Sequence, residues 1–400
     1  MPDAVIVATG RTPIGRANKG SLVNCRPDDL AAHVMKAVMA KIPQLDPEQI
    51  EDVIMGCGMP AGESGHNIAR VAAILAGWEV PGVTMNRYCA SSLVAIRTAA
   101  HAVRAGEGDV FMCAGVEAVS RYVNGFADAG GHNPAFAEAQ ARTEARSPAV
   151  SEPWTPLKGL PDVYIAMGQT AENVVEQEKV SREDMDRFAC LSQNRAVESQ
   201  NNGYFEQEII PVTLEDGTVV SKDDGPRPGT TVEVLANLKP SFREGGSVTA
   251  GNSCPLNDGA AAVVVMSDTK ASELGITPLA RIVSSGVSSL NPEIMGLGPI
   301  EASRRALKRA KMTMDDIDLV EINEAFAAQI VPASKYLGID WEKLNVKGGA
   351  IALGHPFGMT GARIMTTLLH ALKDEGKTYG LETMCVAGGQ GMAMIVERLS

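Results

Sequence analysis

The chain has 400 residues, of which 45% are hydrophobic and 21% are charged. This length predicts two or three domains with well-buried cores, and the near-average composition excludes a disordered protein. The formal net charge of -12 at pH 7 argues against sequence-independent binding of nucleic acid, which requires a basic surface.

Short β-branched runs alternate with helical patterns along residues 1–119. The first helix has a start signal, Arg26-Pro27-Asp28, before an apolar periodic run. The alternation predicts crossover units on a largely parallel, buried sheet. The expected strands are Val5–Ala8, Val53–Met55, Val83–Met85 and Val110–Cys113, and the expected helices are Leu30–Ala40, Ile68–Ala76 and Leu93–Ala105.

Residues 120–248 have a different character. Clusters of Gly, Asn and Pro surround one clear helical stretch, Glu183–Gln200. Long loops in a compact protein often carry function. We therefore predict a loop-rich domain over residues 120–248 that covers a binding site.

The last third repeats the pattern of the first. Gly-rich strand ends recur in CAGVEAVS at 113–120 and CVAGGQGMA at 385–393. Two copies of one α/β unit explain this similarity, and we expect one half at 1–119 together with 249–272 and the other at 273–400. In the second half the expected strands are Ala280–Val283, Leu319–Ile322, Thr383–Val386 and Ala393–Val396, and the expected helices are Ala302–Ala310 and Ile364–Leu372.

The seven cysteines are scattered and form no CxxC pair, unlike a secreted disulfide framework. The N-terminus lacks a basic segment followed by a long apolar one, and apolar runs such as 260–266 are too short to cross a bilayer. We expect a soluble, cytoplasmic protein without a membrane span.

Cys89 lies in MNRYCASSL, between an apolar strand and a helix of small residues. The N-terminus of a helix lowers the pKa of a thiol and offers unpaired N–H groups to a developing oxyanion. The position is therefore suited to a nucleophile. A buried structural cysteine is the alternative interpretation.

His355 lies in GGAIALGHPFGMTGAR, between Gly and Pro, where we expect a constrained turn after an apolar strand. A histidine held in such a turn can act as a base for a thiol or donate to a carbonyl oxygen. A turn histidine that only bonds to the backbone is the alternative.

Cys385 in ETMCVAGGQGMA follows a short apolar strand and precedes a Gly-rich turn. If the repeated halves bring Cys89, His355 and Cys385 together, they supply a nucleophile, a base and a second proton-transfer group. The same residue types bind zinc, but their wide separation disfavours a metal site.

These motifs, taken together, resemble the thiolase family over essentially the whole chain. The motifs that carry the resemblance are NRYCASSL, GSVTAGNSCPLNDGAAAVVVMS at 246–267, NEAFA at 323–327, GGAIALGHPFGMTGAR and CVAGGQGMA. The resemblance implies an α/β thiolase fold, in which two pseudo-repeated halves form α-β-α-β-α layers beneath the loop-rich insertion.

The resemblance also implies catalytic roles. Cys89 would be the nucleophile, His355 its base, and Cys385 the acid or base at the α-carbon of acetyl-CoA. Asn323 would hold a water that forms one oxyanion hole with His355. The backbone N–H groups of Cys89 and Ala387 would form the second oxyanion hole, and no metal is implied.

Coenzyme A contacts follow from the same resemblance. Arg227 in DDGPRPGT matches a position near the nucleotide, although an exposed surface role is the alternative. The residues that match the pantetheine channel are Met167, Phe242, Ala250 and Phe326.

Three positions depart from the family pattern. Cys254 and Pro255 replace a common Ser-Gly, which removes one expected pantetheine hydrogen bond. Ala387 replaces a common Gly and would be strained if the turn demands a positive φ. Ala166 replaces the His often found in acetoacetyl-CoA-specific members, which favours a broader, degradative specificity.

The resemblance thus implies an acyl-CoA C-acyltransferase of fatty-acid β-oxidation. It would cleave 3-oxoacyl-CoA reversibly to acetyl-CoA and a shortened acyl-CoA through acyl-Cys89, with coenzyme A as substrate and no cofactor. The alternatives are an acetoacetyl-CoA-specific acetyltransferase, a 3-oxoadipyl-CoA thiolase, a ketoacyl synthase and an inactive acyl-CoA carrier. We expect a homodimer or homotetramer, with a complex with a hydratase/dehydrogenase subunit as a further option.

Overall fold

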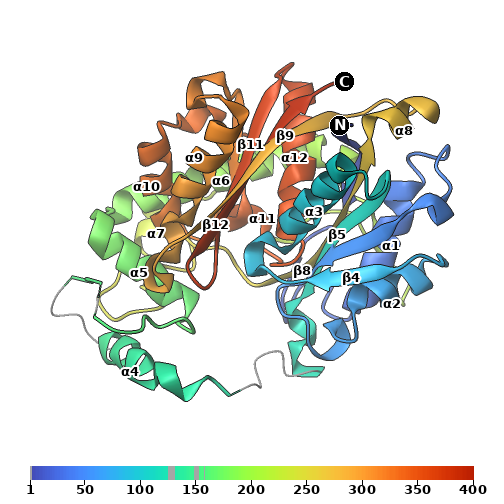
Figure 1. Ribbon diagram of the computed structural model, residues 1–400. Helices are drawn as coiled ribbons and strands as arrows, with labels where there is room; N and C mark the ends of the chain where they lie inside the picture. Colours follow the sequence, from blue (N-terminus) through green and yellow to red (C-terminus); the bar gives the residue numbers. More distant parts are fainter. Residues whose placement is uncertain (1, 125–130, 148–152, 157) are drawn as a thin grey trace.

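The computed structural model describes residues 2–124, 131–147, 153–156 and 158–400, so parts of the expected insertion lie outside the described residues. Both termini lie at the same end of the molecule (Figure 1). None of the helices in these ranges is long and apolar enough to cross a membrane.

Within the described ranges, ten strands form one sheet, in the order β10-β11-β12-β9-β1-β8-β5-β3-β4 with β2 paired to β8. A separate hairpin pairs β6 (Val212–Thr213) with β7 (Val219–Val220). The strands of the large sheet are β1 Ala4–Arg11, β2 Gly15–Arg16, β3 Asp52–Gly56, β4 Gly82–Met85, β5 Val110–Ala118, β8 Asn257–Ser267, β9 Ala280–Ser289, β10 Leu319–Ile322, β11 Tyr379–Val386 and β12 Gln390–Arg398.

The expectation of a largely parallel sheet is wrong. Only β3–β4, β3–β5 and β10–β11 are parallel, whereas β8 runs antiparallel to β1 and β5, and β9 runs antiparallel to β1 and β12. The turn at Gly388 and Gly389, with φ of 74° and 76°, connects β11 directly to its antiparallel neighbour β12. An apolar run predicts a buried strand but not its direction, which is why the sequence misled here.

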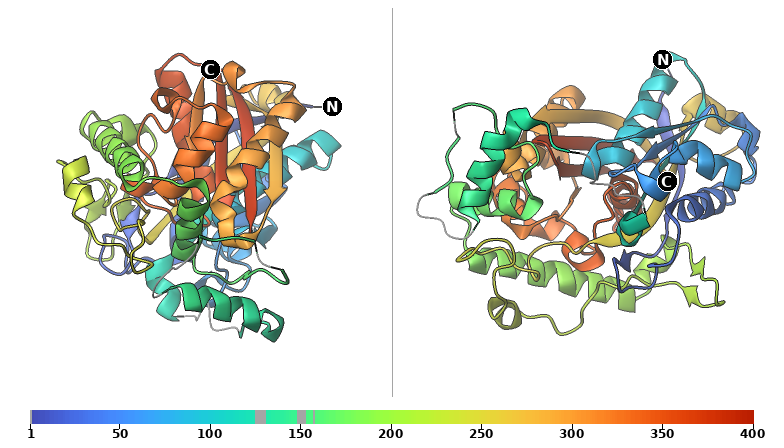
Figure 2. Two further views of the ribbon diagram at one scale, coloured as in Figure 1. Left: turned by 90° about the vertical axis from the view of Figure 1, so that its left-hand side faces the viewer. Right: turned by 90° about the horizontal axis from the view of Figure 1, so that it is seen from below.

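The helices form outer layers on the two halves and one further layer between the halves. Outer helices α1 and α2 cover the N-terminal half, α9 and α10 cover the C-terminal half, and α3 packs against α12 between the halves (Figures 1 and 2). The helices are α1 Pro27–Met39, α2 Ile68–Leu75, α3 Ser91–Ala105, α4 Ala137–Arg146, α5 Met167–Glu178, α6 Arg182–Asn201, α7 Val232–Ala236, α8 Asp268–Glu273, α9 Gly298–Ala310, α10 Ala327–Leu337, α11 Ala350–Leu353 and α12 Thr360–Asp374.

Apolar side chains fill the spaces between these layers in three clusters. One lies between the halves and includes Ile96 of α3 and Leu368 of α12. The other two lie beneath the outer helices and include Val34 of α1 and Ile330 of α10. The layers therefore follow the expected α-β-α-β-α order, and the predicted fold class is confirmed.

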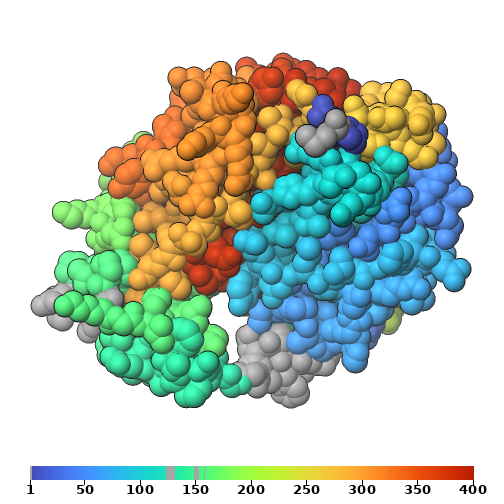
Figure 3. Space-filling view, in the orientation of Figure 1, coloured from blue at the N-terminus to red at the C-terminus, as the bar shows by residue number. Residues whose placement is uncertain are grey.

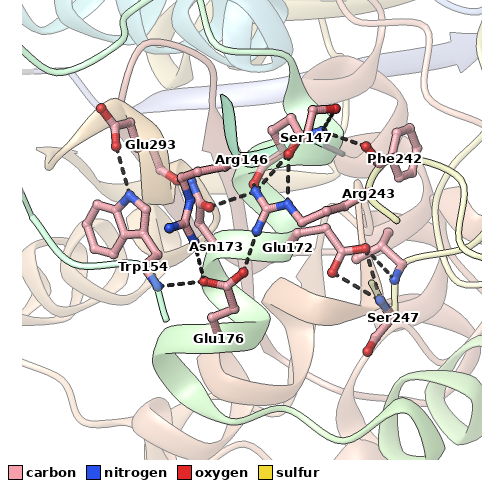
Figure 4. Close-up of polar contacts among 12 residues, drawn as sticks. Arg146, Ser147, Trp154, Glu172, Asn173, Glu176, Phe242, Arg243, Ser247 and Glu293 are labelled. Atoms are coloured by element: carbon pink, nitrogen blue, oxygen red, sulfur yellow. Dashed lines mark hydrogen bonds and ion pairs between the residues drawn. The ribbon is translucent and has the colours of Figure 1, made fainter. Parts of the chain in front are cut away.

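Partly buried ion pairs hold helices α4 and α5, which lie within residues 120–248. Glu176 of α5 accepts hydrogen bonds from Arg146 of α4 at 2.6 Å and from Arg243 at 2.5 Å (Figure 4). Trp154 donates through Nε1 to Glu293 at 2.8 Å. In the space-filling view, the face is hollowed between the segment around α4 and the main body (Figure 3).

Candidate active site

Cys89 lies in a strained turn between β4 and α3. The turn is a short 3-10 helix, η3 (Tyr88–Ala90), which begins with Tyr88 at a φ of 44°. This left-handed conformation is unusual for a bulky residue. It is stabilised because Ser91 Oγ accepts from Arg87 N at 2.9 Å and donates to the carbonyl oxygen of Tyr88 at 2.7 Å.

The thiol of Cys89 is not ionised in the free protein. Burial raises its pKa to about 12, although the backbone N–H groups of Ala387 and Cys89 oppose this shift. The expectation that the helix N-terminus lowers this pKa is therefore wrong, because the loss of hydration outweighs the nearby N–H groups. The backbone N–H groups of Cys89 and Ala387 both approach the sulfur.

His355 follows a single helical turn, α11, rather than the expected strand. Short apolar runs such as AIAL suit either structure, so the sequence alone did not distinguish them. Thr360 Oγ1 donates to the carbonyl oxygen of Pro356 at 2.7 Å and therefore accepts the Nδ1–H of His355 at 2.6 Å. This arrangement leaves His355 Nε2 as the acceptor nitrogen.

Asn323 meets this nitrogen, with its Nδ2 at 3.3 Å from His355 Nε2. Burial, followed by the positive charge of Arg363, lowers the pKa of His355 to about 3. The imidazole is therefore neutral at pH 7 and can accept a proton. The Oδ1 atom of Asn323 is buried and has no hydrogen-bond partner among the described residues.

Cys385 is the penultimate residue of β11 and is fully buried. Its Sγ donates to Gln329 Oε1 at 3.1 Å. Burial raises the pKa of Cys385, and so does negative charge on Cys89, which lies close to it. Ala387 does not adopt a positive φ, because Gly388 and Gly389 make the turn, so the strain considered for this alanine is absent.

Contacts between the two halves link the segments that carry Cys89 and His355. Turn η3 packs against β11 and the beginning of α12. Glu117, a fully buried carboxylate at the end of β5, accepts from the backbone N–H groups of Gly58 at 2.7 Å and Gly358 at 2.8 Å. It thereby fastens the turn after His355 to the N-terminal half.

Several of these polar partners were not found from the sequence. Gln329 lies two residues after the NEAFA motif, and Thr360 lies inside the motif that contains His355. The motifs could therefore have identified both side chains as candidates. Glu117 carries no motif signal, because the glycines that it links, Gly58 and Gly358, are far from it in sequence.

The residues expected along the pantetheine channel come partly together. Phe242 and Phe326 form an edge-to-face pair with ring centroids 5.9 Å apart. The ring of Phe242 packs directly on the beginning of α5, because a side chain at Gly168 would overlap it. Met167 is the first residue of this helix. Ala250 is exposed, and no described contact joins it to this pair.

Arg227 and Cys254 lie in different surroundings. Arg227 is exposed over much of its side chain. Partial burial lowers its pKa, and so does the positive charge of the nearby Arg16. Cys254 is half-buried, and its backbone N–H donates to the carbonyl oxygen of Ala325 at 3.0 Å. Burial raises the pKa of Cys254, and so does negative charge on Cys89.

Curated relatives match the chain over its whole length. It is 44% identical to the 3-oxoadipyl-CoA/3-oxo-5,6-dehydrosuberyl-CoA thiolase of Escherichia coli (strain K12), with 100% of both chains covered. It is 42% identical to the 3-ketoacyl-CoA thiolase of Bacillus subtilis (strain 168), covering 99% of this chain and 100% of that one.

Solved structures and family models agree with these relatives. The crystal structure of the Bacillus anthracis acetyl-CoA acetyltransferase superposes with a TM-score of 0.86 at 39% identity, covering 100% of this chain and 99% of that one. Human mitochondrial 3-ketoacyl-CoA thiolase gives a TM-score of 0.85 at 34% identity, with the same coverage. Residues 4–269 match the thiolase N-terminal domain model, and residues 276–398 match the thiolase C-terminal domain model. The chain therefore belongs to the thiolase family and is an acyltransferase.

Proposed function

We propose that this acyltransferase catalyses CoA-dependent thiolytic cleavage of 3-oxoacyl-CoA through an acyl-Cys89 intermediate. The observation that carries the proposal is a chain of contacts between the halves. His355 presents an acceptor nitrogen beside Asn323, and Gln329 bonds to both Asn323 and Cys385. Cys89 lies in turn η3, which packs against β11, and negative charge on Cys89 raises the pKa of Cys385. These groups supply a nucleophile, a base and a second proton-transfer group.

The first half-reaction cleaves the carbon–carbon bond. His355 Nε2 takes the Sγ proton of Cys89, and the resulting thiolate attacks the 3-oxo carbon. Acetyl-CoA then leaves as an enolate, and Cys385 donates its Sγ proton to the α-carbon. The buried Oδ1 of Asn323 supports the role expected for this residue, because it is available to accept a hydrogen bond from a bound water.

The second half-reaction releases the shortened acyl group. The thiol of free CoA passes its proton to the thiolate of Cys385 and attacks the carbonyl carbon of acyl-Cys89. Cys89 then leaves as a thiolate and takes back its proton from His355. The oxyanion formed at this stage accepts hydrogen bonds from the backbone N–H groups of Cys89 and Ala387. One such donor is typically worth on the order of 10²–10³ in rate.

Coenzyme A binds along the insertion in this proposal. Its pantetheine arm lies near Met167, Phe242, Ala250, Cys254 and Phe326, where the aromatic pair and the thiol of Cys254 mark one wall. The two neighbouring guanidiniums, on Arg227 and Arg16, favour an anionic ligand, which supports binding of the CoA phosphates there. CoA acts as a substrate, and no cofactor enters the proposal.

A panel of substrates tests this function. CoA-dependent cleavage would be measured for acetoacetyl-CoA, for longer straight-chain 3-oxoacyl-CoA and for 3-oxoadipyl-CoA. We expect activity across chain lengths, as Ala166 favours, with a role in fatty-acid β-oxidation. Cleavage of acetoacetyl-CoA alone or of 3-oxoadipyl-CoA alone would favour the narrower alternatives. No cleavage of any substrate would refute the proposal.

We also propose a cytoplasmic homo-oligomer assembled through the N-terminal half. Strand β4 lies at the edge of the sheet, where its unpaired backbone groups are available to a second copy. Four large apolar side chains near this edge are exposed, namely Ile74, Leu75, Val83 and Tyr88.

All seven cysteines are free, which supports the proposed location in a reducing compartment.

A further inference from the structure

Gln329 connects the two polar groups on the C-terminal side of the site. It lies in α10 and is 1% exposed. Its Oε1 accepts the S–H of Cys385 at 3.1 Å, and its Nε2 donates to the backbone carbonyl oxygen of Asn323 at 3.2 Å. One amide thus contacts both the second thiol and the residue beside His355.

The orientation of this amide is fixed by its partners. If the amide were flipped, its oxygen would face the carbonyl oxygen of Asn323, which offers no proton. The acceptor oxygen therefore faces Cys385 and favours the S–H form of that thiol. The position of Gln329 is also restricted, because a Cβ on Gly296 would lie only 3.0 Å from the Cβ of Gln329.

We propose that Gln329 is a positioning residue for the proton transfer at the α-carbon of acetyl-CoA. It fixes the Cys385 sulfur and keeps the thiol protonated in the resting enzyme, ready to donate to the departing enolate. The proposal rests on the role of Cys385 in the proposed function. The side-chain hydrogen bonds of Gln329 go to Cys385 and Asn323 and not to Cys89 or His355, so Gln329 acts on the proton transfer at Cys385.

The step served by Gln329 is a simple proton transfer. In cleavage, the Sγ proton of Cys385 passes to the α-carbon of the enolate, and Cys385 becomes a thiolate. In the reverse direction, the thiolate takes a proton from the methyl group of acetyl-CoA. Both directions share one transition state, so a displaced sulfur slows both, and a displacement of about 1 Å can cost on the order of 10²-fold in rate.

The test compares two reactions of acetyl-CoA in one enzyme. Exchange of its α-hydrogens in D₂O requires Cys385, whereas acetyl transfer to isotopically labelled CoA requires only Cys89 and its base. In Gln329→Met we expect exchange to fall on the order of 10²-fold. Acetyl transfer should stay within about threefold of the unsubstituted enzyme, because the backbone N–H of Asn323 remains bonded to Thr383 at 3.0 Å.

Ser334→Ala is the matched control. Ser334 is a buried residue on the same helix that bonds to Val331 and Trp341, away from the thiols, so both reactions should persist in this variant. Gln329→Ala provides a second test and should show the same selective loss. Equal losses of exchange and transfer in both Gln329 variants, or no loss of exchange, would overturn the proposal. If the unsubstituted enzyme showed neither reaction, the proposed function itself would fail instead.

Discussion

Cys89 and His355 are both neutral in the free protein, because burial raises the pKa of the thiol and lowers the pKa of the imidazole. A nucleophile that is ionised only when it reacts is protected from other electrophiles. Ionisation then requires proton transfer to His355 within the site, where the N–H groups of Cys89 and Ala387 stabilise the sulfur anion. In the proposed mechanism, the same N–H groups later stabilise the oxyanion.

The two thiols should have separable roles. Cys89→Ala should abolish acyl transfer to the enzyme, because no other nucleophile takes its place. Cys385→Ala should retain acylation from acyl-CoA but lose α-hydrogen exchange on acetyl-CoA, because the second proton-transfer group is missing. Mass spectrometry of the protein and of acetyl-CoA in D₂O measures both outcomes. Exchange that survives in Cys385→Ala would show that the roles are assigned wrongly.

The pKa of His355, about 3, predicts an unusual pH dependence of the rate of acyl-enzyme formation. A base with an ordinary histidine pKa of about 6.5 is mostly protonated and inactive at pH 5. Here the base stays neutral at pH 5, so the rate constant of acyl-enzyme formation should change less than about twofold between pH 7 and pH 5. Rapid-quench measurements, with circular dichroism to check folding, test this. A tenfold fall centred near pH 6.5 would contradict it.

At the scale of elements, the site depends on how closely α3 approaches α12. Gly361 of α12 allows this approach, because a Cβ there would lie 2.5 Å from the backbone nitrogen of Leu93. Cys89 precedes α3 and His355 precedes α12, so the contact between these helices sets the distance between the proposed nucleophile and the proposed base. Glu117 adds a second link through Gly358.

Gly361→Ala should therefore impair both stability and activity. Alanine gains about 1 kcal/mol in helix propensity, but overpacking costs about 1–3 kcal/mol, and the clash with backbone atoms should outweigh the gain. We expect a lower thermal midpoint and at least about tenfold slower acylation of Cys89. Gly131→Ala is the matched control, because a Cβ there meets nothing within 4 Å. Unchanged stability and rate in Gly361→Ala would contradict this account of the helix contact.

At the scale of the whole molecule, the sequence was sufficient to predict the layered architecture and the thiolase family. Periodic patterns marked the long helices and buried strands, and the motifs around Cys89, His355 and Cys385 identified the family, while the roles of these three residues stay predictions. The sequence did not predict the strand directions, the helical turn before His355 or the direction of the Cys89 pKa shift. Each depends on contacts between distant segments, as do the hydrogen bonds of Glu117 and Gln329.

The exposed edge strand predicts how copies associate. Val83→Lys places a charge on edge strand β4 and should shift the oligomer toward the monomer, because a lysine at an edge opposes strand pairing. Light scattering after size-exclusion chromatography measures this change. Val219→Lys is the control, because Val219 is exposed in the small hairpin outside the large sheet. An oligomer that persists in Val83→Lys would exclude assembly through this edge.

The most direct measurement is the mass of the peptide containing Cys89 after the enzyme meets a 3-oxoacyl-CoA without free CoA. The account predicts that this peptide gains one shortened acyl group while the peptides containing Cys254 and Cys385 remain unmodified. Subsequent addition of CoA should remove the acyl group. Cleavage of the substrate with no acyl group on Cys89, or with the acyl group on another residue, would contradict the account.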